Sequence, residues 1–139
     1  MTHNPIYRGV IPAQAAAGEL WPQVSALLKR SLPYGRGEYE LEDIQAELAA
    51  GRLLAVACLD AGVVRFVVTC SLVIYPRKRV LYIQHGAGVR GTHLADTVRR
   101  VARELECDWI ETRTRNSVAR LYRRAGFDIN YCVPILEVQ

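Results

Sequence analysis

The feature that most restricts the fold of this sequence is a change in hydrophobic period near Gly86. Before Gly86, apolar runs alternate with tight turns, and connections this short join antiparallel strands. After it, a glycine-rich stretch leads into a helical pattern and then into a further apolar run at Trp109–Arg113. A helix between two strands of one sheet implies a parallel pair with a right-handed crossover. The early runs are Leu53–Leu59, Val63–Tyr75 and Val80–Gln84, and the turns are Asp60–Gly62 and Pro76–Lys78.

Helical periodicity places helices before and after these strands. The apolar stripes are Leu20, Val24, Leu27 and Leu28 in a first helix, Leu41, Ile44 and Leu48 in a second, and Leu94, Val98, Val101, Ala102 and Leu105 in a third. Gly51 suits the C-terminal end of the second helix. A short fourth helix spans Val118–Arg124, and a closing strand spans Ile129–Val138 with Pro134 at an edge or bulge. The predicted fold class is α/β: a mixed, mostly antiparallel, twisted sheet with a central parallel strand pair and helices on both faces.

Length and composition exclude several classes of protein. The 139 residues suit one domain, residues 1–139, and no apolar run approaches the ~20 residues of a membrane span. Met1–Pro12 lacks the order of a signal peptide, so we expect a cytoplasmic protein, or one packaged into a virion from the cytoplasm. Without a Cys-x-x-Cys motif, the cysteines are expected to be buried thiols: Cys58, Cys70, Cys107 and Cys132. His85 and His93 have no accompanying ligands, so no metal is expected.

The charged residues are unevenly distributed. The formal net charge is +4, and arginines gather in the second half of the chain. Such a surface suits an anionic cofactor, a nucleic acid or an acidic protein, and a solvated helix face is the alternative. The residues are Arg90, Arg99, Arg100, Arg103, Arg113, Arg115, Arg120, Arg123 and Arg124.

The glycine-rich stretch Gly86–Gly91 lies where a strand meets a helix. The first N–H groups of a helix and its dipole favour an anion there, and glycine allows the backbone to approach a phosphate closely. Arg90 adds positive charge at the rim. This arrangement predicts a phosphate-binding site, and a plain connector is the alternative.

Two segments resemble the Gcn5-related N-acetyltransferase (GNAT) family. Arg90–Ala95 is similar to the family's pyrophosphate signature, with His93 in place of its central glycine. Asn116–Phe127 is similar to the family segment that ends in Leu-Tyr, three residues, Gly-Phe, although its Asn116-to-Tyr122 spacing is one residue shorter.

The resemblance implies acetyl-CoA as the cofactor, with no metal, and an amine acceptor that is a small molecule or a protein. The strand of Gln84 and the strand of Trp109 would splay apart to admit the coenzyme, and a backbone N–H near Gln84 would stabilise the oxyanion. Tyr122 would be the general acid, and Glu111 and His85 are the candidate bases. The implied cofactor-binding residues are Gln84, Gly88, Val89, Arg90, Gly91, Thr92, His93 and Asn116.

Scattered positions are also similar to small phage-encoded GNAT-like proteins, some of them labelled internal virion proteins. These positions include Gly37–Ile44, Pro76–Arg79 and Glu106–Glu111. Two functions therefore stay open. One is an acyl-CoA-dependent N-acetyltransferase, and the other is a noncatalytic phage virion protein that binds other virion proteins or DNA. The arginines alone suggest a third, a nucleic-acid-modifying relative.

Overall fold

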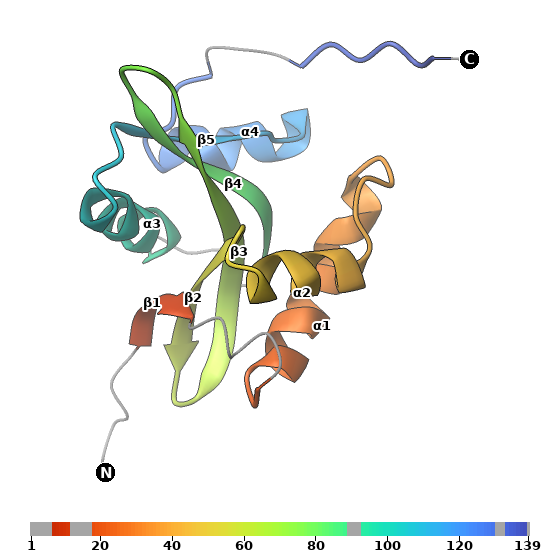
Figure 1. The fold of residues 1–139 in the computed structure, drawn as a ribbon, viewed down its shortest axis with the longest axis vertical. Coiled ribbons are helices and arrows are strands. Elements are labelled where there is room, and N and C mark those ends of the chain that lie inside the picture. The colour runs from red at the N-terminus through yellow and green to blue at the C-terminus, as the bar shows by residue number, and fades with distance from the viewer. Residues whose placement is uncertain (1–6, 12–17, 89–92, 130–132, 139) are drawn as a thin grey trace.

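In the computed structural model, which describes residues 7–11, 18–88, 93–129 and 133–138, five strands form one sheet in chain order (Figure 1). The strands are β1 (Tyr7–Ile11), β2 (Leu54–Asp60), β3 (Val63–Ile74), β4 (Arg79–Gly88) and β5 (Trp109–Thr112). The helices are α1 (Trp21–Ser31), the 3-10 helix η2 (Leu32–Tyr34), α2 (Leu41–Ala49), α3 (His93–Glu104) and α4 (Asn116–Arg124).

The sheet is antiparallel except at one pair. Strands β1 to β4 pair antiparallel with their neighbours, and β4 pairs parallel with β5. Leu81 lies opposite Ile110 in that parallel pair, and α3 connects the two strands. The β2–β3 turn has positive φ at Ala61 (50°) and Gly62 (78°), as a tight hairpin turn requires. The predicted mixed sheet with its parallel pair is confirmed.

Helices cover both faces of this sheet, as Figure 1 shows. On one face, α1 and α2 bury Leu28 and Ile44 completely against residues such as Ala57. On the other face, α3 buries Val98 and Val101 against side chains of β2, β3 and β4. Each of these buried side chains contributes roughly 1.5–3 kcal/mol through removal of apolar surface from water. Alternate side chains of the strands therefore pack into two cores, one on each face of the sheet.

The caps of α2 fix the segment that precedes it. The Glu40 amide donates to Oδ2 of Asp43 (2.8 Å), as in a capping box. At the other end Gly51 has φ +76°, and the Arg52 amide donates to the carbonyl of Glu47 (3.0 Å). This is the glycine helix end predicted from the sequence.

Three features differ from the sequence prediction. Strand β1 was not predicted. The predicted glycine-rich loop begins later than expected, because Gly86–Gly88 belong to β4 and pair with β3. The predicted closing strand is wrong for its described part, because Ile129 and residues 133–138, including Pro134, belong to no strand. Residues 130–132 lie outside the described part of the chain.

Candidate functional site

The parallel ladder between β4 and β5 is short and has fixed ends. At its start, the Arg79 amide donates to Oδ2 of Asp108 (2.9 Å), and the Asp108 amide donates to the Arg79 carbonyl (2.7 Å). The last register pair joins Ile83 and Thr112, where the Thr112 hydroxyl donates to the Ile83 carbonyl (3.3 Å). Beyond this pair β4 continues to Gly88 alongside β3. The pairing of the two parallel strands therefore ends with β5 at Thr112, next to Gln84, where the strands were predicted to splay.

A β-bulge lies at this point. In the β3–β4 register Cys70 pairs with Ile83 and Thr69 pairs with His85, so Gln84 is an extra residue in β4. One extra residue reverses the alternation of side chains beyond it. Ile83 faces the core under α3, whereas His85 contacts Tyr39, which packs against the core under α1 and α2. The bulge thus turns His85 toward the α1–α2 side of the sheet.

The imidazole of His85 is half-buried. Its ring lies edge-on to Tyr39, with 4.9 Å between ring centroids. Its Nε2 atom is buried and has no hydrogen-bond partner among the described residues. Burial lowers the pKa of His85, although the carboxylate of Glu38 acts in the opposite direction. A neutral imidazole with an unpaired nitrogen can accept a proton.

Further polar side chains surround His85 on this side. We call Glu38, Tyr39, Tyr82, His85, Glu111 and Arg113 the polar cluster. Burial raises the pKa of Tyr82, while the Arg113 guanidinium beside its hydroxyl acts to lower it. A hydrogen bond from the Arg36 amide (2.7 Å) lowers the pKa of Glu38, and Arg113 adds to this effect. The cluster therefore combines carboxylates with a guanidinium.

Glu111 enters the polar cluster from β5. It lies opposite Tyr82 in the parallel register, so both side chains share one face of the sheet. The indole Nε1 of Trp109 donates to Oε1 of Glu111 (2.9 Å), which fixes the carboxylate along its own strand. The structure thus brings together two of the predicted catalytic residues, Glu111 and His85, on one face of the sheet.

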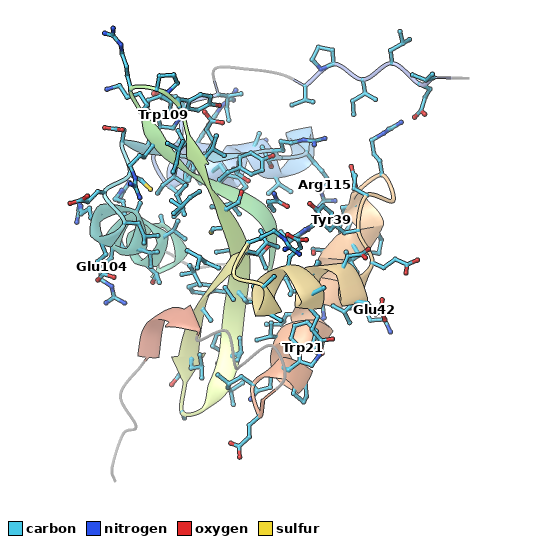
Figure 2. All side chains as sticks on the ribbon, in the orientation of Figure 1. Trp21, Tyr39, Glu42, Glu104, Trp109 and Arg115 are labelled. Atoms are coloured by element: carbon cyan, nitrogen blue, oxygen red, sulfur yellow. The ribbon has the colours of Figure 1, made fainter. Side chains whose placement is uncertain are left out.

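Next to the cluster, the start of α4 contacts η2. The guanidinium of Arg115, which precedes α4, lies 3.7 Å from the ring centroid of Tyr34. Figure 2 labels Arg115 and Tyr39 on the side of the sheet that α1 and α2 cover. This cation–π contact connects the segment after β5 to the segment before α2. It therefore borders the polar cluster on the side of α4.

Tyr122 lies near the C-terminal end of α4 and is half-buried. Its ring packs edge-on against Phe127, with 5.2 Å between centroids. The Phe127 amide donates to the Tyr122 carbonyl (2.9 Å), and Gly126 has φ +98°. These are the bonds and the apolar contact of a Schellman helix end. The Tyr-x-x-x-Gly-Phe spacing therefore has a structural cause of its own.

The predicted phosphate-binding residues are described only in part. Val89, Arg90, Gly91 and Thr92 lie outside the described residues, and His93 and Asn116 begin α3 and α4 by their backbones. Gly88 has φ +134°, and a Cβ there would lie 2.3 Å from the carbonyl oxygen of Arg65. Close contact with β3 thus requires glycine at position 88, whatever else Gly88 does.

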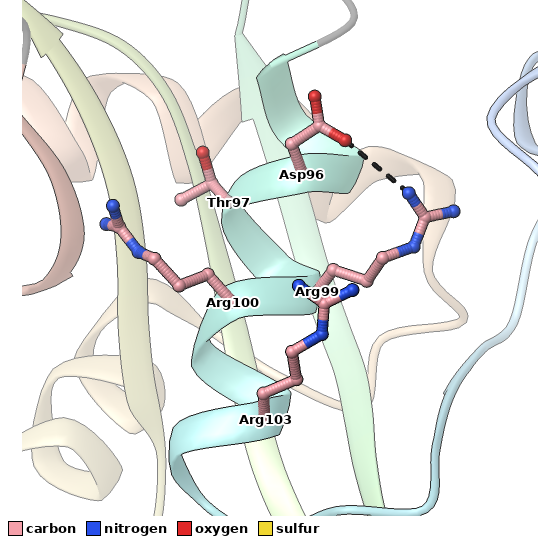
Figure 3. A pocket seen from close by; sticks show the side chains of 5 residues that line it. All are labelled: Asp96, Thr97, Arg99, Arg100 and Arg103. Carbon is pink, nitrogen blue, oxygen red and sulfur yellow. Dashed lines mark hydrogen bonds and ion pairs between the residues drawn. The ribbon is translucent and has the colours of Figure 1, made fainter.

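The α3 arginines line a surface pocket of about 340 Å³, shown in Figure 3. Arg99 and Arg103 follow one another along the helix, as predicted for one solvent face. Two of the three arginines on α3 have a carboxylate near them: Arg99 approaches Asp96 (3.4 Å) and Arg100 approaches Glu104 (4.0 Å). The pocket is lined by Asp96, Thr97, Arg99, Arg100 and Arg103.

Thiol chemistry and metal binding have little support in the described residues. Cys58 and Cys70 are buried free thiols, as predicted, and Cys107 is half-buried, while Cys132 lies outside the description. Burial raises the pKa of Cys70 to about 12, which leaves its thiol protonated and unreactive. In the same part of the chain, no three His, Cys, Asp or Glu side chains group as metal ligands, and no helix is long and apolar enough to cross a membrane.

Sequence reasoning did not single out several members of the polar cluster. Tyr82 belongs to an apolar strand, where a tyrosine usually packs like any aromatic residue. Its signal is weak: a hydroxyl in a strand whose neighbours are otherwise buried. Glu38 and Tyr39 lie within Gly37–Ile44, where the sequence indicates only a family resemblance, and Arg113 is one of many arginines.

No protein-family model matches the sequence, and no curated protein matches it. An aminoglycoside N-acetyltransferase in complex with CoA matches at TM-score 0.72 and 16% identity, over 100% of this chain and 97% of the other. A ribosomal-protein-alanine N-acetyltransferase from Brucella melitensis biovar Abortus 2308 matches at TM-score 0.72 and 13% identity, over 97% and 100%. A predicted acetyltransferase from Clostridium acetobutylicum, solved with acetyl-CoA, matches at TM-score 0.68 and 14% identity, over 96% of both chains.

These identities establish a shared fold. The mixed sheet, its parallel β4–β5 pair and the helices on both faces agree with that likeness. The chain therefore has the fold of the GNAT acetyltransferases.

Proposed function

We propose that this protein is an acetyl-CoA-dependent N-acetyltransferase. The observation that carries the proposal is the end of the β4–β5 pairing at Ile83 and Thr112, next to the bulge formed by Gln84. Strand β4 extends beyond its pairing with β5, and backbone groups on that side need hydrogen-bond partners. The amide groups of a pantetheine arm are suitable partners. CoA and acetyl-CoA are bound in two of the matching structures, which supports this assignment.

In this proposal the cofactor extends from the part of β4 beyond its pairing with β5 to the start of α3. Residues Gln84–Gly88 would line the arm, and Val89, Arg90, Gly91, Thr92 and His93 would hold the pyrophosphate at the N-terminus of α3. Asn116, at the start of α4, would contact the coenzyme arm. A backbone N–H near Gln84 would donate to the oxygen of the thioester carbonyl as negative charge develops on it.

The acceptor would approach from the polar cluster. An amine must lose its proton to attack a thioester, and His85 has a lowered pKa and an unpaired Nε2. We assign His85 as the general base, ahead of Glu111, because one oxygen of Glu111 already accepts the Trp109 N–H. Glu111 would then attract the ammonium form of the acceptor. Tyr122 would donate a proton to the departing thiolate.

Isothermal calorimetry with coenzyme A, followed by turnover with a panel of amines, tests the proposal. We expect the parent protein to bind coenzyme A and to acetylate at least one amine. Tyr122→Phe keeps the ring that packs on Phe127, so we expect turnover to fall about 10²-fold or more, with less than about 1 kcal/mol change in stability.

Tyr75→Phe is the matched control, because Tyr75 is exposed at the β3–β4 turn. Equal turnover by Tyr122→Phe and Tyr75→Phe would remove the acid role from Tyr122. A parent that neither binds coenzyme A nor acetylates any amine would favour the alternative function, a noncatalytic phage virion protein.

A further inference from the structure

The net positive charge of this chain comes from one short segment. Between Thr112 and Gly126 the sequence has five arginines and no acidic residue. The whole chain has a formal charge of +4, so the remaining residues together have −1 (4 − 5). The positive charge therefore belongs to one segment of the chain and not to its average composition. The arginines are Arg113, Arg115, Arg120, Arg123 and Arg124.

The last three of these arginines share one side of α4. Arg120, Arg123 and Arg124 are spaced i, i+3 and i+4, which places them on neighbouring turns of one face, and all three are exposed. Val118 and Tyr122 are half-buried on the opposite side. We call Arg120, Arg123 and Arg124 the α4 arginine face.

This face differs from the arginines of α3. On α3, Arg99 and Arg100 have nearby carboxylates in Asp96 and Glu104. No carboxylate within the described residues forms an ion pair with the α4 arginine face. Arg99 reaches from α3 to the end of α4, where it donates to the carbonyl of Ala125 (3.3 Å). That bond connects α3 to the C-terminal end of α4, close to Arg123 and Arg124.

We propose that the α4 arginine face binds the phosphate backbone of duplex DNA without reading its sequence. Guanidinium groups pair well with phosphates, and duplex DNA presents about one negative charge per 1.7 Å of its axis. A single-stranded nucleic acid would need aromatic side chains on which its bases could stack. The α4 arginine face has none, because the ring of Tyr122 packs against Phe127. Asn and Gln, which read adenine in the major groove, are likewise absent from Arg120–Arg124.

This function goes beyond acetyl transfer and does not depend on it. An N-acetyltransferase with such a face would be held near acceptors that are themselves on DNA. A noncatalytic protein with the same fold could bind DNA in the same way.

Fluorescence anisotropy with a labelled duplex of about 20 base pairs (roughly two helical turns) tests this proposal. The test variant is R120Q/R123Q/R124Q, and the control is R30Q/R65Q/R77Q. The control removes the same three charges from exposed positions on α1, on β3 and at the β3–β4 turn. A difference between the two variants then reports the location of the charge and not the net charge.

We expect the slope of log K against log salt to be shallower for the test variant by about 2.7, since each phosphate contact contributes about 0.9. Between about 50 and 200 mM salt, the affinity of the parent should therefore fall about 40-fold more than that of the test variant. The control should keep the slope of the parent. Duplexes of different sequence should bind alike, and the single strand should bind more weakly.

Three results would overturn the proposal. They are equal losses in the test and control variants, single-stranded DNA bound as tightly as duplex, or complete release of DNA by saturating coenzyme A. The last result would assign the arginines to the cofactor. Calorimetry of the test variant with coenzyme A keeps the two proposals separate. A test variant that no longer binds DNA but still binds coenzyme A supports both proposals. A parent protein that binds DNA but not coenzyme A contradicts only the proposed acetyltransferase function.

Discussion

At the scale of the residue, the position of His85 depends on one extra residue in β4. Regular alternation from Leu81 and Ile83 would have placed His85 under α3, and the bulge at Gln84 turns it toward Tyr39. The sequence predicted His85 as a candidate base at the end of the strand. It did not predict the bulge, because a bulge depends on the register between two strands and leaves no reliable local pattern.

His85→Gln tests the base assignment. The amide preserves a polar side chain but cannot accept the proton, so kcat should fall about 10²-fold or more, with little change in the affinity for coenzyme A. Because burial lowers the pKa of His85, the acidic limb of the parent's kcat/KM profile should lie below pH 6.5. A His85→Gln profile with the same acidic limb as the parent would assign the titration to another group.

The same lowered pKa links His85 to stability. Below about pH 6.5, the ordinary pKa of histidine, the unfolded chain binds a proton more readily than the folded protein does, because folding buries the imidazole. The free energy of unfolding should therefore decrease as the pH falls from 6.5 toward the folded-state pKa. Urea unfolding across this range should show a weaker pH dependence in His85→Gln than in the parent. A parallel decline in both proteins would point to other groups.

Gly88 illustrates a residue with a structural requirement beside a proposed role in binding. Its φ is +134°, and a Cβ added there would collide with the carbonyl oxygen of Arg65. We expect Gly88→Ala to lower the free energy of unfolding by about 3 kcal/mol or more. Gly51→Ala, at φ +76° with open space around it, is the control and should cost about 1 kcal/mol. Equal losses in urea unfolding would contradict the close approach.

At the scale of the element, the sequence predicted the strands β2 to β5 and all four α-helices, because their patterns are local and strong. The tight turns and the β4–α3–β5 crossover then determined the topology. Strand β1 was missed because Tyr7–Ile11 is short and has a glycine at its centre. The closing strand was predicted from apolar residues such as Ile135 and Leu136, which are 51% and 90% exposed. A strand needs a partner, and pairing is not a local property.

The end of α4 gives a prediction at this scale. Gly126 donates its amide to the Arg123 carbonyl (3.0 Å), and Phe127 donates to that of Tyr122 (2.9 Å). Gly126→Ala would strain a left-handed backbone at φ +98°, at a cost of about 1–2 kcal/mol. Both amides should then exchange with solvent about 5- to 30-fold faster, while amides of α1 keep their rates. Unchanged exchange at Phe127 would show that the helix end does not depend on glycine.

At the scale of the whole molecule, the site lies between two independently packed faces. Tyr39 packs against the core under α1 and α2 and contacts His85. The core under α3 includes Leu81 and Ile83, with Ile110 packed against it. The parallel ladder begins with the hydrogen bonds between Arg79 and Asp108 and ends at the pair of Ile83 and Thr112. The sequence predicted both cores from their apolar stripes. It could not predict that Arg113 acts electrostatically on Glu38, because they lie 75 positions apart (113 − 38) in segments without regular structure.

A cofactor that binds along β4 beyond Ile83 should stabilise the entire protein. A ligand that binds only the folded state, at about 100 times its Kd, raises the free energy of unfolding by about 2.7 kcal/mol. For a chain of this length we expect Tm to rise by roughly 10 °C with coenzyme A. Inorganic pyrophosphate at equal concentration is the control, because it has the anionic phosphates but lacks the pantetheine amides that would pair with the strand backbone. Hydrogen exchange should slow at amides within Gln84–Gly88 with coenzyme A and not with pyrophosphate. If pyrophosphate raises Tm as much as coenzyme A, or if these amides keep their rates, the stabilisation is electrostatic alone and β4 beyond Ile83 does not hold the pantetheine arm.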